Sequence, residues 1–157
     1  MAMNNIGDAC RQTGEQKAAI RYYRTALQEF QAIGDRRSQA ETLISMGIAF
    51  SQEQDHAAAI DNFQKALVIA HSLAEKYLQA LAYLGLGGAH LERADHGSAA
   101  DDFRMAIELG QQIRDPETEA RAREGLRTAL PHLNVLAPYA VLRSGHQALP
   151  VRGTSRA

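Results

Sequence analysis

The chain has 157 residues, of which 45% are hydrophobic and 22% are charged, a composition typical of one soluble domain with a continuous core. Its 17 Lys and Arg residues nearly balance its 18 Asp and Glu residues, so the net charge of -1 gives no overall field that would attract nucleic acid or anionic lipid. The lone cysteine, Cys10, excludes an internal disulfide bond, and no stretch has the roughly 18 apolar residues of a membrane span. We therefore expect a cytoplasmic protein without a targeting segment and without a direct nucleic-acid or membrane partner.

Residues 1–34 are predicted to form two helices separated by the turn-forming stretch TGEQ at 13–16. In the second of these helices Ala19, Tyr23 and Ala26 recur at steps of four and three. This spacing places them on one apolar stripe of a helix. The segment is therefore predicted to be a pair of antiparallel helices.

Residues 35–74 and 75–114 repeat this plan. Each copy has an internal break, EQDH in the first and RADHG in the second, and the copies are bounded by the stretches GDRR, SLAEK and IRDPE. Gly34 can end one helix because glycine readily adopts the left-handed conformation of a helix C-terminus. The residues expected to cap the following helices are Asp35, Asp55 and Asp95.

The three copies match each other at a spacing of 40 residues. A glycine in each first helix is followed twelve residues later by an alanine, then by an aromatic residue and another alanine in the second helix. The glycine and alanine residues at these positions are small and would let paired helices approach closely. The matched positions are Gly7, Gly47 and Gly87; Ala19, Ala59 and Ala99; Tyr23, Phe63 and Phe103; and Ala26, Ala66 and Ala106.

The last predicted element is a closing helix over residues 116–130. Asp115 is expected to cap it, Pro116 to occupy its first position, and Pro131 to stop it. Residues 132–157 break the period and carry arginines without any acidic residue, so we expect a tail that is largely disordered or docked on the domain of residues 1–131.

This pattern resembles the tetratricopeptide repeat, whose consensus places an aliphatic-Gly pair in the first helix and Ala, aromatic and Ala in the second. Each copy here is about six residues longer than the usual 34. In this respect the chain is similar to the longer-helix branch of the family, which includes spindle-orientation adaptors of the Pins type and repeat domains of bacterial regulators. The resemblance implies an all-α fold, a right-handed superhelical array of antiparallel helix pairs (a solenoid) that ends in a closing helix.

The resemblance also implies that the first helices line a concave groove that binds a protein or peptide. Family members use the positions three before and one, four and five after the glycine. Those positions are apolar in the middle of this chain and polar toward one rim; they could also be covered by neighbouring helices or by the tail. They are Asn4, Asp8, Arg11, Gln12, Ile44, Ile48, Ser51, Gln52, Leu84, Gly88, Leu91 and Glu92.

No arrangement of reactive groups in the sequence favours an enzyme, a metal site or a cofactor. His56 and His96 recur at the start of successive second helices and are expected to be solvated. His90 and Cys10 occupy positions where the consensus has aromatic residues, so we expect both to be packed in the core. Asp101 and Asp102 are adjacent and would point apart on a helix, unlike a catalytic pair of carboxylates.

Three hypotheses on function remain open at this stage. The first is a non-catalytic module that binds a peptide or helix in the concave groove. The second is a sensory or oligomerisation segment of a larger bacterial transcription regulator. The third is a structural array that associates with itself through its first helix, which has only about six residues before Gly7. That short start indicates either a piece of a longer array or a frayed native terminus.

Overall fold

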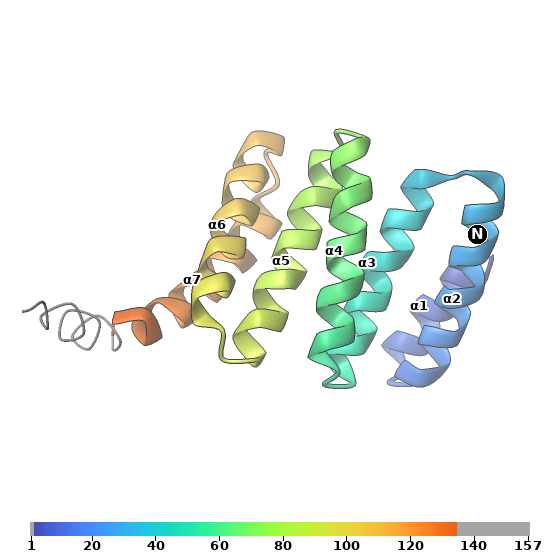
Figure 1. The fold of residues 1–157 in the computed structure, drawn as a ribbon, viewed down its shortest axis with the longest axis horizontal. Coiled ribbons are helices and arrows are strands. Elements are labelled where there is room, and N and C mark those ends of the chain that lie inside the picture. The colour runs from blue at the N-terminus through green and yellow to red at the C-terminus, as the bar shows by residue number, and fades with distance from the viewer. Residues whose placement is uncertain (1, 135–157) are drawn as a thin grey trace, which may run out of the picture.

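The computed structural model describes residues 2–134, which form seven helices and no strand (Figure 1). Part of the predicted tail, residues 135–157, lies outside the described residues. None of the seven helices combines the length and apolar character needed to cross a bilayer. The helices are α1 (Ala2–Gln12), α2 (Gln16–Ile33), α3 (Arg36–Gln52), α4 (His56–Ser72), α5 (Lys76–Glu92), α6 (His96–Ile113) and α7 (Pro116–Asn134).

The helices form two layers. Each helix packs against the next along the chain, and α3 also packs against α5, as α5 does against α7. In Figure 1 the second helices α2, α4 and α6 lie in front, and α1, α3 and α7 lie behind them. The predicted all-α solenoid is therefore confirmed, with one layer made by the first helix of each pair and the other by the second.

Six turns of one geometry connect the helices, one every 20 residues. The residue at the corner of each turn has a positive φ, and the next residue donates its backbone N–H to the carbonyl five residues earlier, as Asp55 does to Phe50 at 2.9 Å. This is the Schellman arrangement that satisfies the last carbonyls of a helix. The corner residues are Gly14, Gly34, Gln54, Ala74, Ala94 and Arg114.

Aspartates cap four of the helices, as the sequence predicts. Asp95, for example, accepts a hydrogen bond from the backbone N–H of Ser98 at 3.2 Å. The side-chain and backbone hydrogen bonds from Ser98 also hold the pKa of Asp95 below its ordinary value, because they stabilise the carboxylate. The other capping residues are Asp35, Asp55 and Asp115.

Each core aromatic residue of a second helix packs on the glycine of its own first helix. A Cβ atom added to Gly47 would lie 2.6 Å from the ring of Phe63, and one added to Gly87 would lie 2.7 Å from the ring of Phe103. Phe63 and Phe103 also pack on a glycine of the following helix, Gly85 or Gly125. The close approach expected from the small residues is therefore confirmed, and it fixes the spacing of successive helices.

Helix α7 ends the array differently from the prediction. Pro131 does not stop it, because the helix continues to Asn134. Pro131 lies in the final turn, so the hydrogen bond it removes and the clash of its ring with the preceding turn affect only the end of the helix. Arg127 stands 40 residues after Gly87, where the other first helices have glycine. An arginine leaves no room at this place for an aromatic ring like the one that packs on Gly87.

Candidate partner-binding groove

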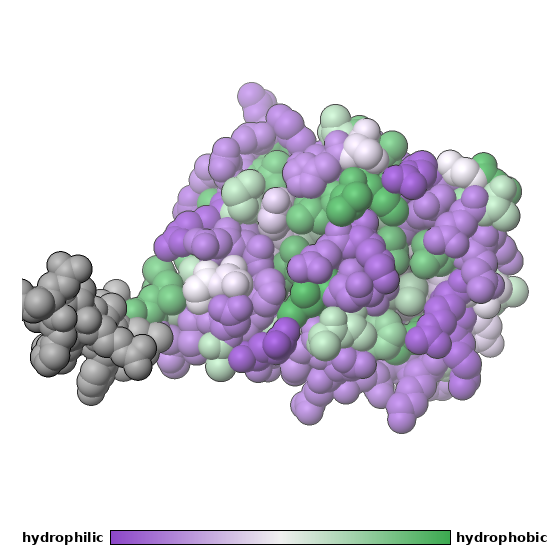
Figure 2. Space-filling view, viewed as in Figure 1, coloured by the Kyte–Doolittle hydropathy of each residue, from purple (hydrophilic) through white to green (hydrophobic). Residues whose placement is uncertain are grey.

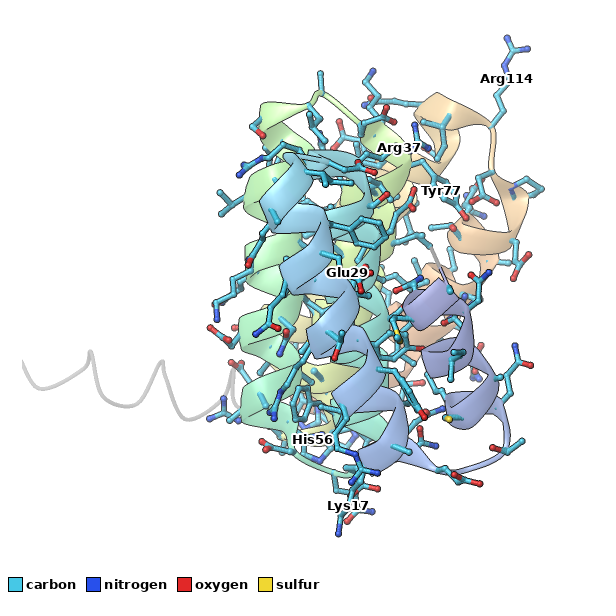
Figure 3. The ribbon with its side chains drawn as sticks, turned by 90° about the vertical axis from the view of Figure 1, so that its right-hand side faces the viewer. Lys17, Glu29, Arg37, His56, Tyr77 and Arg114 are labelled. Carbon is cyan, nitrogen blue, oxygen red and sulfur yellow. The ribbon has the colours of Figure 1, made fainter. Side chains whose placement is uncertain are left out.

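Half of the predicted groove residues surround one hollow on the layer of first helices, here called the concave hollow. Its volume is about 440 Å³, and its lining comes from α3, α4, α5 and α7 with the turn before α4. Figure 3 shows His56, one of its lining residues, at the lower edge of the molecule together with Lys17, where α4 and α2 begin. The predicted residues that line the concave hollow are Ile48, Ser51, Gln52, Leu84, Gly88 and Glu92.

The concave hollow combines an apolar floor with a polar rim. Ile48 and Phe63 supply hydrocarbon and aromatic surface, while Glu92 and Arg121 contribute opposite charges. A Cβ atom added to Gly88 would meet nothing within 4 Å, so the backbone of α5 borders open space there. An apolar floor with a few polar groups is the usual make-up of a binding pocket.

The structure adds His56 to the site, where the sequence predicts a solvated side chain. His56 is half-buried, and its Nδ1 atom is buried without a hydrogen-bond partner in the described chain. A buried polar atom without a partner costs free energy, but this atom has almost no accessible surface, so only the rest of the His56 side chain borders the concave hollow. The signal in the sequence is its recurrence at the 40-residue spacing, because the side chains of Gln16 and His96 have the same property.

Predicted groove residues of the first helix pair form hydrogen bonds with other side chains of the chain and do not line the concave hollow. The hydroxyl of Tyr23 donates to Asp8 Oδ1 at 2.7 Å and accepts from Nε of Arg11 at 3.3 Å. Burial, assisted by the bond to Asp8, raises the pKa of Tyr23 to about 12. Asn4 Oδ1 accepts from the hydroxyl of Thr42 at 3.0 Å. These side chains are thus committed to holding α1 against α2 and α3.

The predicted apolar floor is only partly exposed. Ile44 is 6% exposed and packs with Leu78 and Ala82 of the next first helix in the largest core cluster, so it is not an open groove residue. Leu84 borders the concave hollow but is 9% exposed. Leu91 is half-buried against the core around Phe103, and Gln12 is exposed at the end of α1. Ile44 and Leu84 are therefore mostly covered by neighbouring helices, which is the alternative that the sequence leaves open.

The remaining reactive side chains are occupied structurally. His90, which the sequence predicts to be packed in the core, has its Nδ1 atom 2.7 Å from Asp102 Oδ2. Burial raises the pKa of Asp102, and the contact with His90 opposes this rise. Asp101 points elsewhere and pairs with Arg104. His96 stacks on His132, with ring centroids 4.1 Å apart. Within residues 2–134 no three His, Cys, Asp or Glu residues are grouped as metal ligands.

Comparison with known proteins decides the family. A sequence profile described as the tetratricopeptide repeat matches residues 1–72 and again residues 38–112. The chain belongs to the tetratricopeptide repeat family. Repeats of this family generally mediate protein–protein interaction and typically form non-catalytic scaffolds.

A solved structure supports the fold of this tetratricopeptide repeat chain. The crystal structure of BtubC (BKLC) from P. vanneervenii superimposes with a TM-score of 0.68 at 16% sequence identity, covering 99% of this chain and 68% of that one. At this identity the likeness concerns the fold alone. A search of curated proteins finds no match to the chain.

Proposed function

We propose that this tetratricopeptide repeat chain is a non-catalytic, cytoplasmic module that binds a peptide or helix of a partner protein in the concave hollow. The observation that carries the proposal is the meeting of an apolar floor and charged rim residues in one cavity. Ile48 would contact an apolar side chain of the partner. Glu92 and Arg121 would set its orientation through charge.

Blocking the concave hollow is expected to abolish this binding. In Gly88→Tyr the new ring extends into open space rather than into the core, so the fold should be retained. Dodecapeptides selected from a displayed random library against the wild-type chain should bind Gly88→Tyr at least about tenfold more weakly, which is 1.4 kcal/mol. Fluorescence anisotropy with the enriched peptides measures the difference.

Thr25→Tyr is the matched control, because Thr25 is exposed on α2 in the other layer. Both variants should melt close to the wild-type temperature, and the control should bind the peptides normally. Peptides that bind Gly88→Tyr as tightly as the wild type would place their site elsewhere and refute the proposal.

We also propose self-association through the outer face of α1. Ile6 is 41% exposed, whereas Met46 and Leu86, its counterparts in the next two repeats, are 5% and 4% exposed. Met46 is covered by α2, the second helix that precedes it in the array. Ile6 has no such cover in residues 2–134, and a second copy of the chain would cover this apolar side chain.

Sedimentation velocity over a concentration series tests this association. The wild-type chain should show a growing dimer fraction, and Ile6→Glu should remain monomeric because a charged group would be buried at the contact. Ile33→Glu is the control, since Ile33 is 74% exposed on α2. A wild-type chain that stays monomeric at every attainable concentration contradicts the proposal.

A further inference from the structure

A second cavity system lies on the opposite layer, between the second helices α2 and α4, and is here called the α2–α4 furrow. Two adjoining cavities of about 710 and 470 Å³ share Arg24 and Phe50 as lining residues. Helices α2 and α4 form its walls and α3 its floor, because α3 packs against both while α2 and α4 have no Cα atoms within 8 Å of each other. Figure 2 shows hydrophobic residues in patches among hydrophilic ones on this face.

The floor of the furrow is apolar and its edge exposes further hydrocarbon. Leu27 and Phe50 are half-buried there, and Val68 on α4 is 68% exposed. Along α2 the lining runs from Lys17 to Gln31. These 14 steps correspond to about 21 Å at 1.5 Å per residue, so a helix of about 14 residues would fit along the furrow.

The α2 wall is basic. Lys17, Arg21 and Arg24 follow each other at intervals of four and three residues and all line the furrow, which Arg36 of α3 joins at the other end. In residues 2–134, Arg21, Arg24 and Arg36 form no ion pair. These three arginines are therefore available to carboxylates of a partner.

The carboxylates that line the furrow already form ion pairs or hydrogen bonds within the chain. Glu53 lies 4.0 Å from Lys17, and Asp61 lies 2.6 Å from Lys65. Asp55 caps α4 by accepting from the N–H of Ala58. The lining thus has five basic side chains against three acidic ones, although the whole chain has a net charge of -1.

The corresponding space between α4 and α6 is neither open nor basic. Its equivalents of Gln31 and Leu43 are His71 and Tyr83, whose rings contact edge to face at a centroid distance of 6.3 Å. On α4 the residues in the places of Lys17, Arg21 and Arg24 are Ala57, Asp61 and Gln64. The open, basic furrow is therefore particular to the first two repeats rather than a general consequence of the repeat fold.

We infer that the α2–α4 furrow binds an acidic amphipathic helix of a partner protein. Its apolar stripe would pack on Leu27 and Phe50. Carboxylates placed about one helical turn apart would meet Arg21 and Arg24, whose own spacing follows the same period. This site lies on the layer opposite the concave hollow, so the inference stands independently of the proposed function.

The probe is a fluorescent synthetic peptide of about 14 residues, the length that the furrow accommodates. It carries leucine at steps of three and four and glutamate at the flanking positions. A second peptide has glutamine in place of every glutamate. Anisotropy titration of the full chain should give saturable binding of the acidic peptide. The glutamine peptide should bind at least about tenfold more weakly, and added salt should weaken binding of the acidic peptide.

Two furrow variants test the location. Arg21→Gln/Arg24→Gln/Arg36→Gln removes the unpaired charges, and Gln31→His/Leu43→Tyr introduces the pair that fills the space between α4 and α6. Each variant should bind the acidic peptide at least about tenfold more weakly than the wild type does. The matched control for charge is Lys76→Gln/Arg93→Gln/Arg114→Gln, which changes three exposed basic residues outside the furrow and should leave binding unchanged.

The Gly88→Tyr variant separates this inference from the proposed function. The furrow site is supported if the furrow variants lose binding of the acidic peptide while Gly88→Tyr binds it normally. Loss only in Gly88→Tyr would place the peptide in the concave hollow and overturn the inference. Absence of saturable binding, or equal binding by the charge variant and its control, would overturn it as well. Melting curves of all variants confirm that the fold is retained.

Discussion

Gly87→Leu should lower the free energy of unfolding by about 1–3 kcal/mol, whereas Gly88→Leu, one residue further along the same helix, should not. A Cβ atom at position 87 would already lie 2.7 Å from the ring of Phe103, and a leucine would force α5 and α6 apart. At position 88 the space is open. There leucine should stabilise the chain by up to about 0.8 kcal/mol, because it favours a helix more than glycine does.

Urea denaturation of the two variants beside the wild type gives the comparison. Because the residue introduced and the helix are the same, the difference between the variants isolates the contact with the aromatic ring. Equal destabilisation by both would mean that α5 is rotated from the orientation described, and the 40-residue register would then need revision.

Ile44→Asp and Leu84→Asp should each destabilise the chain by more than about 3 kcal/mol, and together they should unfold it, since domains of this size have only about 5–15 kcal/mol of stability. The exposed fractions of 6% and 9% mean that each carboxylate would lose most of its contact with water. Far-UV circular dichroism during heating measures the loss. Val68→Asp is the control, because a side chain that is 68% exposed accepts a charge at little cost.

This prediction reverses what the sequence alone indicates for these two positions. Interpreted as open groove anchors, Ile44 and Leu84 would tolerate aspartate and lose only partner binding. Their burial makes stability the property that changes. A double variant that melts at the wild-type temperature would show that the layer of first helices is open at both positions and would restore the first interpretation.

The repeat fold could be predicted from the sequence because its determinants are local and recur. Asp55 and Asp95 mark helix starts, and the recurrence of Gly47 and Ala59 in each copy indicates where paired helices approach closely. The end of α7 could not be predicted, because a proline ordinarily ends a helix, whereas α7 continues for three residues beyond Pro131.

The candidate site was less predictable because its shape depends on neighbouring helices. Ile44 and Ile48 are four residues apart, so they differ by only about 40° around α3. Even so, Ile44 is covered in the core cluster that includes Leu78, while Ile48 lines the concave hollow. Which of two such residues is covered depends on how closely α5 approaches, and that distance follows from packing across the repeat rather than from the sequence of α3.

Helix α3 borders both the concave hollow and the furrow. Leu43, Met46 and Phe50 form the floor of the furrow, and Ile48 and Ser51, on the same helix, line the concave hollow. A ligand that shifts α3 on one side must therefore change the shape of the site on the other. Thermodynamic reciprocity then requires the two affinities to change by the same factor, whichever ligand arrives first. Any coupling between the two proposed sites would therefore pass through this single helix.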